Sequence, residues 1–243
     1  MNFRFTKILN KKIVKKHLQK LQNVLRHKHH PLIHQIHQVH KISRKTLFYV
    51  KEYGPHSNVP KTILKESIKI ILLASLLSSF GGFALEEIKS LFLTMIPLII
   101  LLPALNDMVG DYGTIVSARF STMLHEGLVE KKWWKEAAVQ KLFWQIMITA
   151  SITAIMSALI ALILTAVMEP GSTFTALFAV KIFAITLIDV LALVSILFFV
   201  AIIAGLHYFN LKEDPNNFLI PITTSVADFG NMFVLAVLIV VFF

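Results

Sequence analysis

Seven carboxylate, amide and hydroxyl side chains lie inside or at the edges of long apolar stretches of this sequence. They are Asn106, Asp107 and Asp111; Asp189; and Thr224, Asp228 and Asn231. Polar and ionisable groups in such stretches are costly, so each marks a candidate functional position. Oxygen ligands of this kind suit hard divalent cations. Acidic groups outnumber basic ones in these stretches, which favours a cation over an anion as the ligand.

The first group follows a run that carries prolines and glycines. Pro97 and Pro103 precede Gly110 and Gly113, with Asn106, Asp107 and Asp111 around them. This pattern predicts a helix that breaks inside the membrane, which is tolerated only where the freed backbone lines a cavity or packs on protein. Exposed carbonyls beside carboxylates would then serve as ligands for a cation or for its waters.

Asp228 and Asp189 each stand alone in a long apolar run. Pro221 predicts the start of the last helix, which places Asp228 about two turns further in, with Thr224 and Asn231 on nearby faces. Coordination of a cation is the favoured interpretation of Asp228, and a hydrogen-bonded aspartate between helices is the alternative. For Asp189, a pore-lining position and a buried hydrogen bond between helices both stay open.

Five apolar runs must position these groups. A membrane-spanning helix takes about 20 apolar residues, and five stretches qualify. They cover residues 66–85, 90–109, 143–168, 177–207 and 218–243. The runs are continuous rather than alternating, so they predict helices and not barrel strands. The expected fold class is therefore all-α, a polytopic membrane protein with five transmembrane helices and a basic, helical N-terminal arm.

Charge divides the chain into two expected domains. Residues 1–65 hold 15 of the 24 Lys and Arg residues and 8 of the 10 His residues, but a single acidic residue, whereas residues 66–243 are slightly acidic. The net charge of +10 therefore belongs to the arm, which suits an anionic lipid surface, and no nucleic-acid partner is expected. Lys and Arg also cluster in the connection between the second and third runs. By the positive-inside rule the N-terminus is cytoplasmic and the C-terminus outside.

The arm carries a second candidate feature, a row of histidines. His30, His34 and His37 follow helical spacing, so they could share one face as a metal site or a pH sensor. No carboxylate accompanies them, which favours a solvated basic face. The chain has no cysteine, so thiolate metal sites and cysteine nucleophiles are excluded.

Two segments resemble the paired signatures of the MgtE magnesium channel family and its relative, solute carrier family 41. Residues 110–113 (Gly-Asp-Tyr-Gly) resemble the Gly-Asn-x-Gly turn of MgtE proteins. Residues 117–122 (Ser-Ala-Arg-Phe-Ser-Thr) resemble the Ala-Ser-Arg-Leu-Ser-Thr run of the solute carrier group. Residues 214–228 follow the Asp-Pro…Pro-x-Thr…Asp pattern. The resemblance covers residues 66–243, a single five-span unit, without the CBS sensor domains of MgtE proteins.

The resemblance implies a homodimer whose pore lies between two five-span units. It implies that Asp228 is the main pore ligand for hydrated Mg²⁺ and that Asp111 lies near it. Asp111 stands where the family has Asn, which adds a negative charge. Two symmetry-related carboxylates at a two-fold contact can balance a divalent ion, which one cannot.

These observations together predict an integral protein of the cell membrane that transports a divalent cation, with Mg²⁺ as the leading candidate. In this interpretation Asp228 binds the ion, while Asp111 and Asn106 or Asp107 shape the site and Thr224 and Asn231 support it. The alternatives are an exchanger coupled to Na⁺ or H⁺, and a non-transporting membrane scaffold. An enzyme is not expected, because the only adjacent His-Glu pair, at residues 125–126, has no nucleophile beside it.

Overall fold

A computed structural model describes residues 59–129, 133–169, 175–211 and 213–243. Within these ranges every regular element is a helix. The elements are α4 (Val59–Glu87), α5 (Lys89–Leu93), α6 (Ile96–His125), the 3₁₀ turn η1 (Trp133–Lys135), α7 (Ala137–Met168), α8 (Ala176–Leu211) and α9 (Asn216–Phe242). Residues 1–58 lie outside the described ranges, and with them the expected arm helices and the histidine row.

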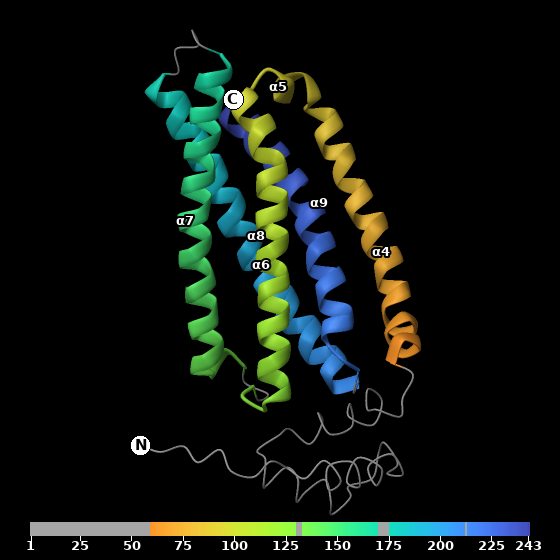
Figure 1. Ribbon diagram of the computed structural model, residues 1–243. Coiled ribbons are helices and arrows are strands. Elements are labelled where there is room, and N and C mark those ends of the chain that lie inside the picture. Colours follow the sequence, from red (N-terminus) through yellow and green to blue (C-terminus); the bar gives the residue numbers. More distant parts are fainter. Residues whose placement is uncertain (1–58, 130–132, 170–174, 212) are drawn as a thin grey trace, which may run out of the picture.

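Five of the described helices are long and apolar enough to cross a membrane: α4 over Ser67–Glu87, and α6, α7, α8 and α9 over their full lengths. The predicted all-α fold with five spans is thereby confirmed. The start of α4, the α6–α7 connection and the α8–α9 connection lie at one end of the molecule (Figure 1). The short helix α5 and the C-terminus lie at the other end, as expected when successive spans alternate in direction.

The prediction of a broken second helix is wrong. Helix α6 continues from Ile96 to His125 through Pro103, Gly110 and Gly113. Pro97 lies in its first turn, where the missing N–H costs nothing. In a bilayer the backbone has no water to bond. A continuous helix therefore leaves fewer N–H and C=O groups without a hydrogen bond than a broken helix would. The predicted boundaries of residues 90–109 therefore missed both ends of this helix.

The predicted start of the last helix is also wrong. Helix α9 begins at Asn216 with Pro215 as its N-cap residue, and Pro221 lies inside the helix. Both prolines could start a helix, and the chain uses the earlier one. Asp228 therefore lies near the middle of α9, further from the start of the helix than a start at Pro221 would place it.

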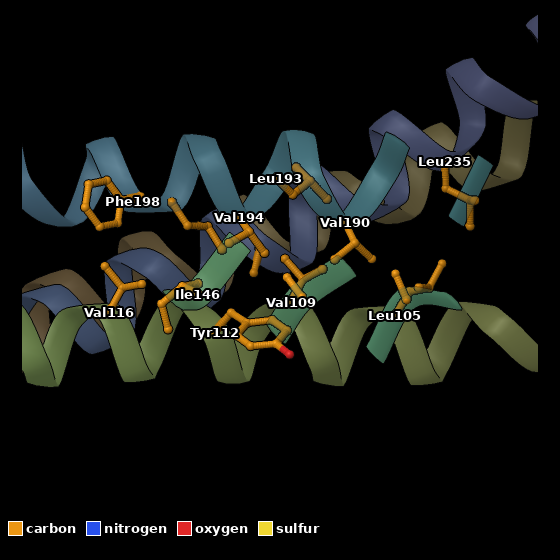
Figure 2. Close-up of a cluster of buried hydrophobic side chains, with 14 of the residues drawn as sticks. Leu105, Val109, Tyr112, Val116, Ile146, Val190, Leu193, Val194, Phe198 and Leu235 are labelled. Atoms are coloured by element: carbon orange, nitrogen blue, oxygen red, sulfur yellow. The ribbon is translucent and has the colours of Figure 1, made fainter. Parts of the chain in front are cut away.

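The core lies where α6, α7, α8 and α9 meet. Leu105, Val109 and Val116 of α6 face Val190, Val194 and Phe198 of α8 (Figure 2). Leu193 of α8 lies against Gly230 of α9, and the Tyr112 hydroxyl reaches Thr153 of α7. On α7 the buried residues at the contact include an alanine row, Ala150, Ala154, Ala158 and Ala161. Small residues at this spacing let helix backbones approach closely, which is the main source of packing energy between helices in lipid.

Helix α4 stands apart from this core and packs chiefly against α9. Figure 1 shows it leaning away from α6. Most of its large apolar side chains are exposed, among them Leu72, Leu76 and Phe80. In a membrane such a surface meets lipid or another protein chain.

Gly205 of α8 offers a test of the core packing. A Cβ at this position would lie 2.9 Å from Cδ1 of Phe120, a ring that is itself fully buried. We expect Gly205→Ala to lower the thermal unfolding temperature in detergent, because overpacking costs about 1–3 kcal/mol and exceeds the gain of about 1 kcal/mol in helix propensity. Gly82→Ala is the matched control, since its Cβ would meet nothing within 4 Å. Equal unfolding temperatures for the two variants would contradict this packing.

Candidate functional site

The Asp228 carboxylate is held by hydrogen bonds from two other helices. Its Oδ1 accepts from Nδ2 of Asn106 in α6 at 2.8 Å. Its Oδ2 accepts from Oγ of Ser78 in α4 at 3.0 Å. Two donors, one to each oxygen, fix the plane of the carboxylate and leave each oxygen with further lone-pair capacity.

Asn231 lies one turn further along α9 and extends this network to Asp189. Its Nδ2 donates to Oδ2 of Asp189 at 2.8 Å, and its Oδ1 accepts from the backbone N–H of Asn106 at 3.3 Å. The opposite amide orientation gives only a 3.4 Å contact from Nδ2 to Oδ1 of Asn106. It would also turn the amide oxygen towards the carboxylate, so the first orientation is the favourable one.

Asp189 and Asn231 are the two fully buried candidate residues. Asp189 is 0% exposed, and its Oδ1 has no hydrogen-bond partner among the described residues. Lys181, on the same helix, instead donates to the backbone oxygen of Phe242 and lies over the Phe243 ring. Within the described ranges no salt bridge joins a cation to Asp189 or to Asp228. A fully buried carboxylate, Asp189, and a half-buried one, Asp228, thus have only neutral hydrogen-bond donors on them in the described residues.

Asp107 and Asp111 lie apart from this network. Both side chains are exposed, and neither takes part in a hydrogen bond in the described structure. Together with the exposed Ala104 and Ala118 they follow helical spacing along one face of α6. A stripe of small and acidic side chains in the middle of a membrane-spanning helix is poorly suited to lipid.

Thr224 also stays outside the network. It is half-buried, and its hydroxyl donates to the backbone oxygen of Ile220 at 2.9 Å, on its own helix. The neighbouring Thr223 instead reaches another helix, with its Oγ1 3.1 Å from Oγ of Ser117. Gly113 lies beside this pair, since a Cβ there would come within 3.1 Å of Thr223. This close contact sets the approach of α6 to α9 about two turns from the Asn106–Asp228 pair.

The structure therefore brings together four of the seven residues that the sequence singled out: Asn106, Asp189, Asp228 and Asn231. It adds Ser78, which the sequence did not indicate. A serine in an apolar helix usually bonds to its own backbone, as Ser79 does to Ser75. No feature of the sequence distinguishes Ser78 from Ser79, so only the packing of α4 on α9 reveals it.

Fold and site define a class: a polytopic helical membrane protein with carboxylates and amides gathered in the interior of its spans. A family model described as MgtE, divalent cation transporter, matches residues 102–238. This is more than half of the chain, and the protein belongs to this family. The match includes most of α6, all of α7 and α8 and nearly all of α9, and it leaves α4 outside. No curated protein and no solved structure matches the chain.

Proposed function

We propose that this protein carries Mg²⁺ across the membrane through a pore between two copies of the chain, with the ion held by the Asp228 carboxylates. Membership of a divalent cation transporter family supports transport of such an ion. The observation that carries the site is the Asp228 carboxylate, in the middle of a membrane-spanning helix and oriented by Asn106 and Ser78 without a cationic partner in the described residues.

The donor set favours Mg²⁺ among divalent cations. Mg²⁺ gives up its waters reluctantly and is held by one or two carboxylates while it keeps much of its hydration shell. Within the described part of the chain no cluster of three or more His, Cys, Asp and Glu residues could hold a metal ion. Sparse oxygen groups of this kind suit a hydrated ion better than one stripped of water.

The exposed face of α6 supports the homodimer. Asp107 and Asp111 lie on that face, where lipid would leave two carboxylates unsolvated. Pairing two copies about a two-fold axis would instead line a shared, water-filled path with both pairs. Asp111 then adds negative charge along the path, and Asp107 contributes in the same way. Thr224 has a bonded hydroxyl but still offers an acceptor oxygen to water.

The orientation with a cytoplasmic N-terminus belongs to the same proposal. Trp133, Lys135 and Trp144 lie at the α6–α7 end of the bundle, where the described chain also begins. Positively charged connections favour the cytoplasmic side, and tryptophans favour the membrane interface. The sequence that precedes α4 is strongly basic as well.

Flux into proteoliposomes tests the transport proposal. Vesicles with purified protein and an internal Mg²⁺ indicator should take up Mg²⁺ from outside, and protein-free vesicles should not. A channel should show the same uptake with and without a sodium or proton gradient, whereas dependence on either gradient would select a coupled exchanger. Absence of flux from a folded protein would contradict transport and favour a membrane scaffold.

A further inference from the structure

The hydrogen bond from Ser78 to Asp228 links the candidate ion site to a helix outside the family match. Helix α4 ends before residue 102, where the matched region begins. Its Oγ–Oδ2 distance of 3.0 Å is that of a formed hydrogen bond. The other side of the same carboxylate is held from α6, so the orientation of Asp228 depends on both helices.

We propose that Ser78 is a positioning residue for ion transport: its hydroxyl orients the Asp228 carboxylate towards the cation, and α4 is thereby part of the ion site. The inference rests on the proposed role of Asp228. Hydrogen bonds to a charged acceptor are about twice as strong as those between neutral groups. Loss of this bond would let the carboxylate rotate about the remaining bond to Asn106.

Two adjacent serines show that the arrangement is specific to Ser78. Ser79 is exposed, and its hydroxyl donates to the backbone oxygen of Ser75 at 2.8 Å on its own helix. That bond is the ordinary arrangement for a serine inside a helix. Ser78 instead points across the helix interface to a carboxylate that is 150 residues away in the sequence.

Gly81 lets α4 approach α9 closely enough for Ser78 to reach Asp228. It lies one turn after Ser78 and is buried against α9. A Cβ on Gly81 would lie 2.8 Å from Sδ of Met232 and 3.2 Å from the backbone Cα of Phe229. The backbone atom cannot move aside without shifting α9, so any larger residue at position 81 would push the two helices apart.

Beside this contact, an open apolar hollow of about 550 Å³ is lined by residues of both helices that include Leu77, Phe80, Phe83, Phe229 and Phe233. Gly81 and Ser78 mark the level at which α4 lies closest to the Asp228 carboxylate on α9. A small displacement of α4 would be enough to break the Ser78–Asp228 bond.

The test compares Ser78→Ala with Ser79→Ala in the proteoliposome assay. We expect Ser78→Ala to raise the Mg²⁺ concentration for half-maximal flux about tenfold, as befits the loss of one hydrogen bond to a charged group, while the maximal flux stays close to wild type. Ser79→Ala should behave as wild type. Ser78→Thr keeps the hydroxyl and should restore most of the apparent affinity, which a purely structural role for Ser78 would not require.

A second pair of variants changes the helix separation without touching a polar group. Gly81→Ala should raise the half-maximal concentration as Ser78→Ala does, and the double variant should add little to either. Gly82→Ala is the control, because a Cβ there meets nothing within 4 Å.

The assay includes Asp228→Asn so that the proposed ion site and the proposed role of Ser78 are tested separately. Flux that survives in Asp228→Asn would overturn the proposed ion site itself. If flux is lost in Asp228→Asn but the half-maximal Mg²⁺ concentration is the same in Ser78→Ala as in wild type, only the role of Ser78 is overturned. A lower half-maximal concentration in Ser78→Ala would also overturn it, since the hydroxyl would then compete with the ion.

Discussion

Asp228→Asn is expected to lower Mg²⁺ flux at least about 100-fold, because the variant replaces the charged oxygen ligand that hard divalent cations prefer with a neutral amide. The substitution keeps the size of the side chain and removes its charge. An amide also has one acceptor oxygen, whereas Asp228 accepts from Asn106 and Ser78 on two oxygens. The variant therefore loses its attraction for the cation, and its new Nδ2 can be satisfied only by donating to Oγ of Ser78, the reverse of the present bond. Flux assays on wild type and variant in matched vesicles measure the effect.

Folding must be separated from transport in this comparison. Asp228→Asn should elute as wild type does in size-exclusion chromatography and should reach the same helix content. Glu86→Gln is the matched control, because Glu86 is an exposed carboxylate whose bond to Lys89 lies outside the bundle. Loss of flux in the control as well would show that the assay responds to any lost carboxylate.

The second large effect is expected at Asp189 and Asn231. Asp189→Leu removes the acceptor for the Asn231 amide in a fully buried position. A buried donor left unpaired costs about 1–3 kcal/mol, and Asn231 would lose the bond that holds its oxygen towards Asn106. We expect this variant to unfold at a lower temperature and to transport Mg²⁺ with a clearly raised half-maximal concentration.

The exchange of the two side chains makes this prediction specific. Asn231→Asp alone places a second carboxylate against Asp189, where the present donor–acceptor distance is 2.8 Å, and like groups at this distance repel. In the double variant Asp189→Asn/Asn231→Asp, the new amide can donate to the new carboxylate, whose other oxygen still accepts from the backbone of Asn106. We expect the double variant to recover most of the unfolding temperature and flux that Asn231→Asp loses. Purely additive losses would contradict the hydrogen bond between the two residues.

Much of the fold follows from the lengths of the apolar runs. Helices are the natural way to satisfy a backbone in lipid, so the number and order of the spans could be predicted. The boundaries of α6 could not, because Pro103, Gly110 and Gly113 are breakers in water and are tolerated in a membrane helix. Pro215 and Pro221 are equally good helix starts in the sequence, and only the folded chain shows which one is used.

The candidate site was partly predictable for a related reason. Asp189 and Asp228 stand out because charges are rare in apolar runs. Their connection through Asn231 and Asn106 depends on how α6, α8 and α9 pack, and sequence spacing carries no information on contacts between helices. Asp107 has the same residue type and lies next to Asn106 in the sequence, yet it faces the outside of the described chain. The two residues differ in the side of α6 on which they lie, and residue type does not reveal that side.

A structure of the protein with Mn²⁺, grown from a lipid phase, is the most direct test of the proposed site. Mn²⁺ takes the same oxygen ligands as Mg²⁺ and can be located by its anomalous scattering. We expect an anomalous peak on a two-fold axis between the Asp228 carboxylates of two copies of the chain. A peak elsewhere in the bundle with none near Asp228, or a chain that binds Mn²⁺ without a partner, would contradict it.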